Sequence, residues 1–212
     1  MESDRSASVT VMTSAPRWFT ETDDDHSARY VEQMRTLAAE GQDLAGEARL
    51  VDAMVKPGSR VLDAGCGTGR VGAALFDRGH RVVGVDMDPE LIAAAREDHH
   101  GPLWIEANLA ELDLPSLGES ERFDAIVVAG NVLAFVAPST ETEVLVRLAA
   151  HLVPEGFVVA GFQIERYDLT EFDRHVADAG FVLEQRFATW DLRPWHADAE
   201  FAVSVLRPRP TE

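Results

Sequence analysis

The sequence contains very little cysteine and very little lysine. Cys66 is the single cysteine among 212 residues, which excludes an intramolecular disulfide and a zinc site built from several cysteines. Lys56 is the single lysine, and it lies in the turn VKPGSR rather than in an apolar stretch. Catalysis through a lysine Schiff base is therefore not expected.

Long apolar runs and an excess of basic residues are also missing. No apolar run approaches the ~20 residues that span a bilayer, and the polar N-terminus MESDRSASVTVMTSAPR lacks the apolar core of a secretory signal. Asp and Glu (37) outnumber Lys and Arg (19), which gives a formal net charge of -18. Because nucleic-acid binding depends on phosphate neutralisation by Lys and Arg, we expect no nucleic-acid partner. No membrane partner and a cytoplasmic location are the corresponding expectations.

Short β-rich runs alternate with helical runs along most of the chain. This alternation is the pattern of βαβ units and a parallel sheet. We expect helices at 26–40, 44–55, 69–78, 89–97, 140–151 and 169–179, and strands at 60–64, 81–85, 103–107, 123–129, 156–162, 181–189 and 200–206. The last two strands are separated only by a short, Pro-broken segment, so they are expected to pair antiparallel at one edge. The prediction is one α/β domain over residues 16–212, preceded by a flexible tail over residues 1–15.

The stretch VLDAGCGTGRVGAAL places an acid and a glycine loop between a strand and a helix. Gly65, Gly67 and Gly69 allow positive φ and close approach of a ligand to the backbone. The helix that starts near Gly69 offers free N–H groups to an anionic part of that ligand. Asp63, at the end of the strand, suits a cation instead.

Two types of cofactor are compatible with a glycine loop at this position. GTGRVG formally satisfies the dinucleotide fingerprint G-x-G-x-x-G, which is weak by itself. Gly65 is the first glycine after the strand. When the fingerprint is aligned to begin at Gly65, Arg70 occupies the position of the third glycine. Asp63 would also face a pyrophosphate unfavourably. These two features favour a cofactor that carries a positive charge.

DAGCGTG resembles the first motif of the class I S-adenosylmethionine-dependent methyltransferases. Four later segments resemble further parts of the same family in the same order: WFTETDDDHSARYVEQM the helical lid of its small-molecule members, VVGVDMD the second motif, FDAIVVAGNVL the fourth strand, and LAAHLVPEGFVVAGF the fifth strand with its preceding helix. The resemblance implies a three-layer Rossmann-like sandwich whose seven-stranded, mostly parallel sheet has an antiparallel C-terminal edge strand. It also implies a lid at about 17–55 and S-adenosylmethionine as the cofactor.

Site residues follow from these motifs. Asp86 ends the second strand, where an acid can accept hydrogen bonds from ribose hydroxyls, and Met87 lies next to the adenine. The family usually has an acid where this chain has Asn108, whose amide oxygen can still accept one hydrogen bond. Cys66 is expected to fill space in the loop. The predicted cofactor-binding residues are Asp63, Gly65, Cys66, Gly67, Thr68, Gly69, Arg70, Asp86, Met87, Asn108, Leu109, Gly130, Asn131 and Val132.

The acceptor is expected beyond the carboxyl ends of the fourth and fifth strands. His26 and Tyr30, on the lid, are candidates for a base or an orienting group, and Asn131 is a candidate for orienting the acceptor. Further residues that can line or wall the cleft are Gln163, Arg166, Tyr167, Trp190, Trp195 and His196. Asn131-Val132-Leu133 is not the Pro-Pro-aromatic signature of the family's adenine-type N-methyltransferases, which argues against methylation of DNA bases. Asp98-His99-His100 is not expected to hold a metal, because adjacent histidines at a helix end rarely converge on one ion.

The function predicted from these motifs is methyl transfer from S-adenosylmethionine to a small-molecule acceptor by in-line displacement. A nicotinamide-dependent reductase is an alternative, although the single Lys56 lies upstream of the loop and cannot supply a Tyr-x-x-x-Lys pair. A non-catalytic module that binds S-adenosylmethionine and acts through a protein partner stays open.

Overall fold

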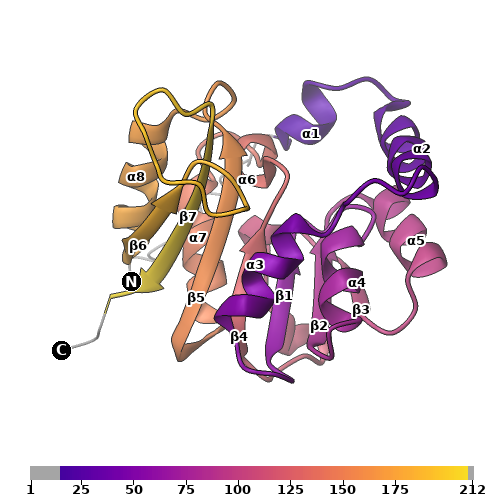
Figure 1. Ribbon diagram of the computed structural model, residues 1–212, viewed down its shortest axis with the longest axis horizontal. Helices are drawn as coiled ribbons and strands as arrows, with labels where there is room; N and C mark the ends of the chain where they lie inside the picture. The colour runs from indigo at the N-terminus through magenta and orange to yellow at the C-terminus, as the bar shows by residue number, and fades with distance from the viewer. Residues whose placement is uncertain (1–14, 210–212) are drawn as a thin grey trace, which may run out of the picture.

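The computed structural model describes residues 15–209, and the tail expected at residues 1–15 lies outside that range except for its last residue. A seven-stranded sheet of order β3-β2-β1-β4-β5-β7-β6 forms its centre (Figure 1). The strands are β1 (Arg60–Ala64), β2 (Arg81–Asp86), β3 (Leu103–Glu106), β4 (Phe123–Val128), β5 (Leu152–Gln163), β6 (Phe181–Phe187) and β7 (Phe201–Pro208). The first five run parallel, and β7 pairs antiparallel with both β5 and β6.

Helices cover both faces of this sheet (Figure 1). They are α1 (Arg17–Thr20), α2 (His26–Ala39), α3 (Gly46–Met54), α4 (Arg70–Phe76), α5 (Pro89–Asp98), α6 (Val132–Phe135), α7 (Glu141–Ala150) and α8 (Leu169–Asp178), with the 3-10 turns η1 (Leu109–Glu111) and η2 (Leu114–Leu117). The predicted α/β sandwich with its antiparallel C-terminal pair is confirmed. Among the described helices, none is both long and apolar enough to cross a bilayer.

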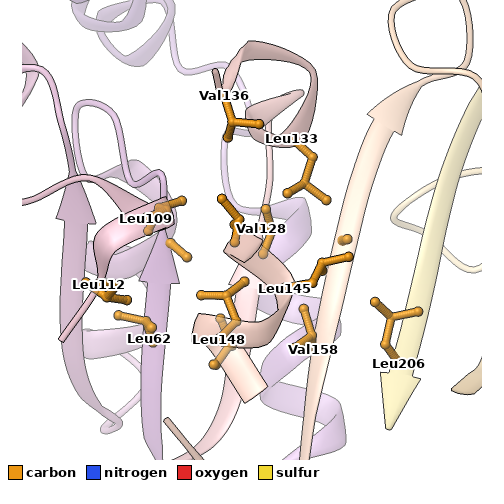
Figure 2. Packing of buried hydrophobic residues seen from close by; sticks show 14 of the residues in the cluster. Leu62, Leu109, Leu112, Val128, Leu133, Val136, Leu145, Leu148, Val158 and Leu206 are labelled. Atoms are coloured by element: carbon orange, nitrogen blue, oxygen red, sulfur yellow. The ribbon is translucent and has the colours of Figure 1, made fainter. Parts of the chain in front are cut away.

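The core forms on both faces of the sheet because successive side chains of a strand point to opposite faces. In β4, Ile126 and Val128 pack toward α7 and η1, while Ala125 and Val127 pack toward α3 and α4. Figure 2 shows the first of these faces, where leucines and valines from the sheet, η1 and α7 meet. β4 reads as a nearly continuous apolar run because both of its faces are covered.

Two details of the sheet differ from the expectation. β5 begins at Leu152, four residues before the predicted start at 156, because Leu152 pairs with Phe123 before the register shifts and Phe157 pairs with Ala125. The segment Pro154 to Gly156 is thus an irregularity within the strand. At the other end β7 lies between β5 and β6, so the edge strand is β6. The short helices α1 and α6 escaped prediction because four residues are too few to show a helical period.

The N-terminal helices take two different positions. α3 belongs to the core layer, since Ala48 and Val51 are fully buried against α4 and the sheet. α1 and α2 instead lie beyond the carboxyl ends of the parallel strands, next to α6 and α5 respectively (Figure 1). Of the segment predicted as a lid at about 17–55, α1 and α2 are therefore the parts placed to cover a site at that edge.

Candidate functional site

A cavity of about 270 Å³ lies at the carboxyl ends of β1, β2 and β4, below α1 and α2. Every predicted cofactor-binding residue lines it except Thr68 and Gly69. Both exceptions lie in the same loop, where Thr68 is buried and Gly69 packs on Trp104. The carboxyl ends of parallel strands meet at one edge of a sheet, which is why residues far apart in sequence converge here.

The glycine loop follows β1 and bends through left-handed conformations. Gly65, Gly67 and Gly69 have φ of 76°, 53° and 82°, which side chains rarely adopt. A Cβ at Gly65 would also overlap with the side chain of Val132, and one at Gly67 would lie 3.5 Å from the ring of Tyr30. The loop thus brings bare backbone to the floor of the cavity.

Asp63 is buried at the end of β1. Its Oδ2 accepts a hydrogen bond from the backbone N–H of Gly72 in the first turn of α4, at 2.8 Å. Burial raises the pKa of Asp63 to about 7, although the Gly72 N–H and the positive charge of Arg70 oppose the rise. A carboxyl in this setting gains most from a cationic partner, which would stabilise its ionised form.

Gly72, the last glycine of GTGRVG, has a packing role. A Cβ there would lie 2.9 Å from Cη2 of Trp104 and 3.1 Å from Oδ2 of Asp63. The glycine therefore allows Trp104 and the Asp63 carboxyl to approach α4, and its presence needs no bound pyrophosphate.

Asp86 supplies a second carboxyl at the end of β2. Its two oxygens accept from the backbone N–H groups of Gly67, at 2.8 Å, and Asp88, at 3.0 Å. Burial raises the pKa of Asp86, while these backbone hydrogen bonds lower it. Each oxygen has a further lone pair for a donor in the cavity.

Met87, Asn108 and Leu109 line the cavity next to Asp86. The side-chain oxygen of Asn108 accepts from the backbone N–H of Ala110 at 3.0 Å and so caps η1. One lone pair of that oxygen and the amide N–H groups remain for a heterocycle. Cys66 lies below, packed with Trp104 and Ile92, and burial raises the pKa of its thiol well above the ordinary value.

An aromatic roof closes the cavity from the N-terminal side. Its members are Trp18 of α1, His26 and Tyr30 of α2, and Phe135 of α6, with the Trp18 ring 4.6, 6.0 and 5.4 Å from the other three rings in turn. Burial raises the pKa of Tyr30 above its ordinary value of 10.0, so the phenol stays protonated at neutral pH and can donate a hydrogen bond but is a poor base. Of the two lid candidates, His26 is the better base by side-chain chemistry.

Asp88 ties this roof to the rest of the molecule. Its carboxyl accepts from the indole N–H of Trp18 at 2.7 Å and from the hydroxyl of Ser27, and it also caps α5. Arg17 adds an ion pair to Glu141 of α7 at 2.9 Å. Two elements on opposite sides of the cavity thus hold α1 in place.

On the far side, Asn131, Gln163 and Arg166 form a hydrogen-bonded chain. Asn131 has a left-handed backbone, φ 67°, and its Oδ1 accepts from the backbone N–H of Gln163 at 2.7 Å. The side-chain oxygen of Gln163 accepts from Nε of Arg166 at 2.8 Å and from Nδ2 of Asn131 at 3.3 Å. Asn131 and Arg166 line the cavity, and a strained backbone of this kind is concentrated at functional sites.

The other suggested cleft residues lie elsewhere. Tyr167 is buried in the core against Phe162 and Phe172 and contacts His175. Trp190 packs over Gly161, Trp195 packs against the core cluster, and His196 is exposed. Six further lining residues were not predicted from the sequence: Trp18, Val71, Leu91, Ala129, Phe135 and Val136. Of these, only Trp18 had a signal in the sequence, namely its place in the lid-like segment.

The Asp98-His99-His100 segment lies away from this cavity. Asp98 is paired with Arg35 of α2 at 2.8 Å, and burial lowers the pKa of His99. Over residues 15–209 no three His, Cys, Asp or Glu side chains are grouped so that they could hold a metal ion.

Comparison with known proteins gives one family. Residues 61–156 match the family model described as a methyltransferase domain. A crystal structure of a TehB-like SAM-dependent methyltransferase from Corynebacterium glutamicum is 39% identical with a TM-score of 0.82, covering 88% of this chain and 100% of that one.

Two curated relatives match over a smaller part. Ribosomal protein L11 methyltransferase from Symbiobacterium thermophilum is 34% identical over 53% of this chain and 35% of the relative. Magnesium-protoporphyrin O-methyltransferase from Rhodobacter capsulatus is 34% identical over 51% of this chain and 48% of the relative. The chain thus spans less than half of the length of either protein, and their names describe both a protein acceptor and a small-molecule acceptor.

Proposed function

The chain belongs to the class I S-adenosylmethionine-dependent methyltransferases, and from this premise we propose that it methylates a small-molecule acceptor by in-line displacement. The single observation that carries the proposal is the cavity itself. A glycine loop, the buried Asp63 and the half-buried Asp86 line one end of it, and an aromatic roof closes it above.

The residues present fit S-adenosylmethionine. Asp63, a buried carboxyl without a cationic partner inside hydrogen-bond distance among the described residues, suits the ammonium of the methionine part. Asp86 suits the ribose hydroxyls, and Met87 with Asn108 and Leu109 suits the adenine. When bound, this cofactor supplies an electrophilic methyl group on a positively charged sulfur.

The contributions of the chain itself are orientation, exclusion of water and proton handling. The left-handed turn at Asn131 and its bonds to Gln163 hold the wall where the acceptor arrives. Orientation of two reactants can supply roughly 7–11 kcal/mol of the barrier. His26, in the roof, is the residue we propose as proton acceptor when the acceptor is a hydroxyl or a protonated amine.

Entry and release require the roof to move. We propose that α1 and α2 form the moving lid and that the contacts of Asp88 with Trp18 and Ser27 hold it closed. α3 is too deeply buried in the core layer to take part. Closure of such lids excludes water from the reaction.

A small acceptor is favoured over a protein or an RNA by the closed roof and by the charge. The net charge of -18 opposes binding of a polyanion. The cavity of about 270 Å³ is near the lower end of the volumes that hold small molecules. A cytoplasmic location remains the prediction made from composition.

The test has a binding part and a turnover part. Calorimetry should show binding of S-adenosylmethionine and S-adenosylhomocysteine but no binding of NADH; the reverse result would defeat the proposal. A metabolite extract incubated with the protein and a trideuteromethyl donor should then yield a species in which CD3 replaces H. Asp86→Asn should abolish both signals, while Asp77→Asn, at an exposed position after α4, should preserve them. Donor binding without any labelled small molecule, together with a stable protein complex, would favour the non-catalytic module.

A further inference from the structure

We propose that Arg166 binds an anionic group of the methyl acceptor, which makes the acceptor a compound with an apolar or aromatic body and a carboxylate or similar oxyanion. This inference rests on the proposed function and specifies the substrate class of the same cavity. It assigns to Arg166 the role of setting specificity.

Arg166 is the cavity-lining cation that lacks a carboxylate partner. The other lining arginine, Arg70, is held by the Glu47 carboxylate at 2.8 and 2.5 Å. Arg166 makes no ion pair within 4.0 Å over residues 15–209. In a chain with 37 acidic residues and a net charge of -18, an exposed cation that lines a cavity and has no acid beside it is placed to bind an anion.

Two contacts orient the guanidinium of Arg166, which is an exposed residue. Its Nε donates to the side-chain oxygen of Gln163 at 2.8 Å, and its Cζ lies 5.6 Å from the centre of the Phe135 ring. Because Nε is occupied, the two terminal nitrogens are left for a ligand. Their fork matches the two oxygens of a carboxylate or a phosphate.

The same contacts join this cation to Asn131, in the wall where the acceptor is proposed to arrive. Gln163, which holds Arg166, is itself held by Asn131 through two hydrogen bonds of 2.7 and 3.3 Å. Asn131 lies three residues after the end of β4, immediately before α6. An acceptor held through its anion at Arg166 is therefore positioned relative to the end of β4.

Apolar side chains line the cavity beside Arg166, beginning with Phe135. Phe135 and Trp18 meet edge to face at 5.4 Å, and Val136 lies beside them in the cavity wall. An aromatic or other apolar body fits against these rings, while a strongly polar body would lose hydrogen bonds to water there. The combination selects an amphipathic anion.

The carboxylate of the cofactor is the competing ligand for Arg166. The sheet order argues against it, because Asp63 and Asp86 end β1 and β2, whereas Arg166 follows β5 on the other side of β4. The test must nevertheless separate the two ligands, so cofactor affinity is measured in every variant.

Benzoate and its neutral counterpart benzamide are suitable probes. They are titrated by ligand-observed NMR into protein saturated with S-adenosylhomocysteine, using wild type, Arg166→Met, Arg166→Lys and the control Arg174→Met on an exposed part of α8. We expect benzoate to bind wild type and Arg174→Met alike, and to bind Arg166→Met at least about tenfold more weakly, as loss of a charge-assisted contact predicts. Arg166→Lys should retain an intermediate affinity, and S-adenosylhomocysteine should bind all four proteins equally.

Three results would overturn the inference. They are equal binding of benzoate and benzamide to wild type, no binding of benzoate, or loss of S-adenosylhomocysteine affinity in Arg166→Met, which would assign the residue to the cofactor. Failure of the proposed function has a different signature, because wild type would then either not bind S-adenosylhomocysteine or bind the donor without transferring its labelled methyl to any small molecule.

Discussion

Binding of the cofactor should be coupled to release of a proton from Asp63. The pKa of this buried carboxyl is about 7, against an ordinary value of 3.8. The difference is about 3 pH units, and each unit corresponds to about 1.4 kcal/mol. Ionising Asp63 in the ligand-free protein is therefore about 4 kcal/mol less favourable than ionising the same carboxyl in water, and an ammonium group placed beside it would partly offset this difference.

The direction in which the affinity changes with pH follows from which state, ligand-free or bound, holds the proton on Asp63. Below about pH 7 the ligand-free protein keeps Asp63 protonated, whereas the complex favours the carboxylate. Binding must then release a proton, so the apparent affinity should fall by up to about tenfold per pH unit as the pH drops from about 7 to about 5. Above about pH 7 Asp63 is already ionised, and this contribution becomes flat.

The same shift affects stability. Between pH 3.8 and about 7 the folded protein binds more protons at Asp63 than the unfolded chain does. The free energy of unfolding of the ligand-free protein should therefore fall across that window as the pH rises, by at most about 4 kcal/mol. Asp63→Asn removes this penalty while its side-chain oxygen can still accept from Gly72.

The assay is calorimetry with S-adenosylhomocysteine in two buffers of different ionisation enthalpy at about pH 6, combined with denaturant unfolding at about pH 8. Wild type should release close to one proton on binding; Asp63→Asn should release almost none, bind more weakly, and be the more stable protein without ligand. A wild-type affinity that does not change with pH, or a variant that retains the proton release, would refute the reasoning.

Three further predictions concern the surroundings of the cavity. Asp88→Ala should speed amide hydrogen exchange in residues 17–39, and loss of the α5 cap should lower the free energy of unfolding by about 1 kcal/mol. Unchanged exchange in these residues would contradict the proposal that Asp88 holds the lid closed. The Cys66 thiol, buried and with a raised pKa, should react with Ellman's reagent only as fast as the protein unfolds; rapid labelling of the native protein at about pH 8 would contradict its burial. Gly72→Ala, whose Cβ would lie 2.9 Å from Trp104, should lower the free energy of unfolding by roughly 1–3 kcal/mol relative to wild type. Ala73→Gly, in the same helix, is the comparison variant.

Much of the site was visible in the order of residues along the chain. Asp63 and Asp86 each end an apolar run that alternates with helices, and parallel strands bring their carboxyl ends to one edge. The glycine loop was equally clear, because only glycine takes up successive positive φ values without strain. Local pattern therefore predicted the side of the cavity proposed for the cofactor, and the two acids do line the cavity.

The side of the cavity proposed for the acceptor depends on contacts that no local pattern contains. Trp18 meets Asp88 across 70 residues of sequence, and Asn131 meets Gln163 across 32. Tyr167 and Arg166 are neighbours in sequence, yet one is buried in the core and the other lines the cavity. Which of two adjacent side chains faces a site is decided by the packing of the whole domain.

The strand order shows the same division. Alternating runs predict parallel strands, and the short connection before β7 predicts an antiparallel pair. That β7 enters the sheet between β5 and β6 depends instead on the apolar residues on both faces of β7, whose burial requires a neighbouring strand on each side and packed side chains on both faces. Periodicity along the chain specifies which segments become helices and strands. Which strands become neighbours is decided by the burial of their side chains, and that burial exists only once the elements have assembled.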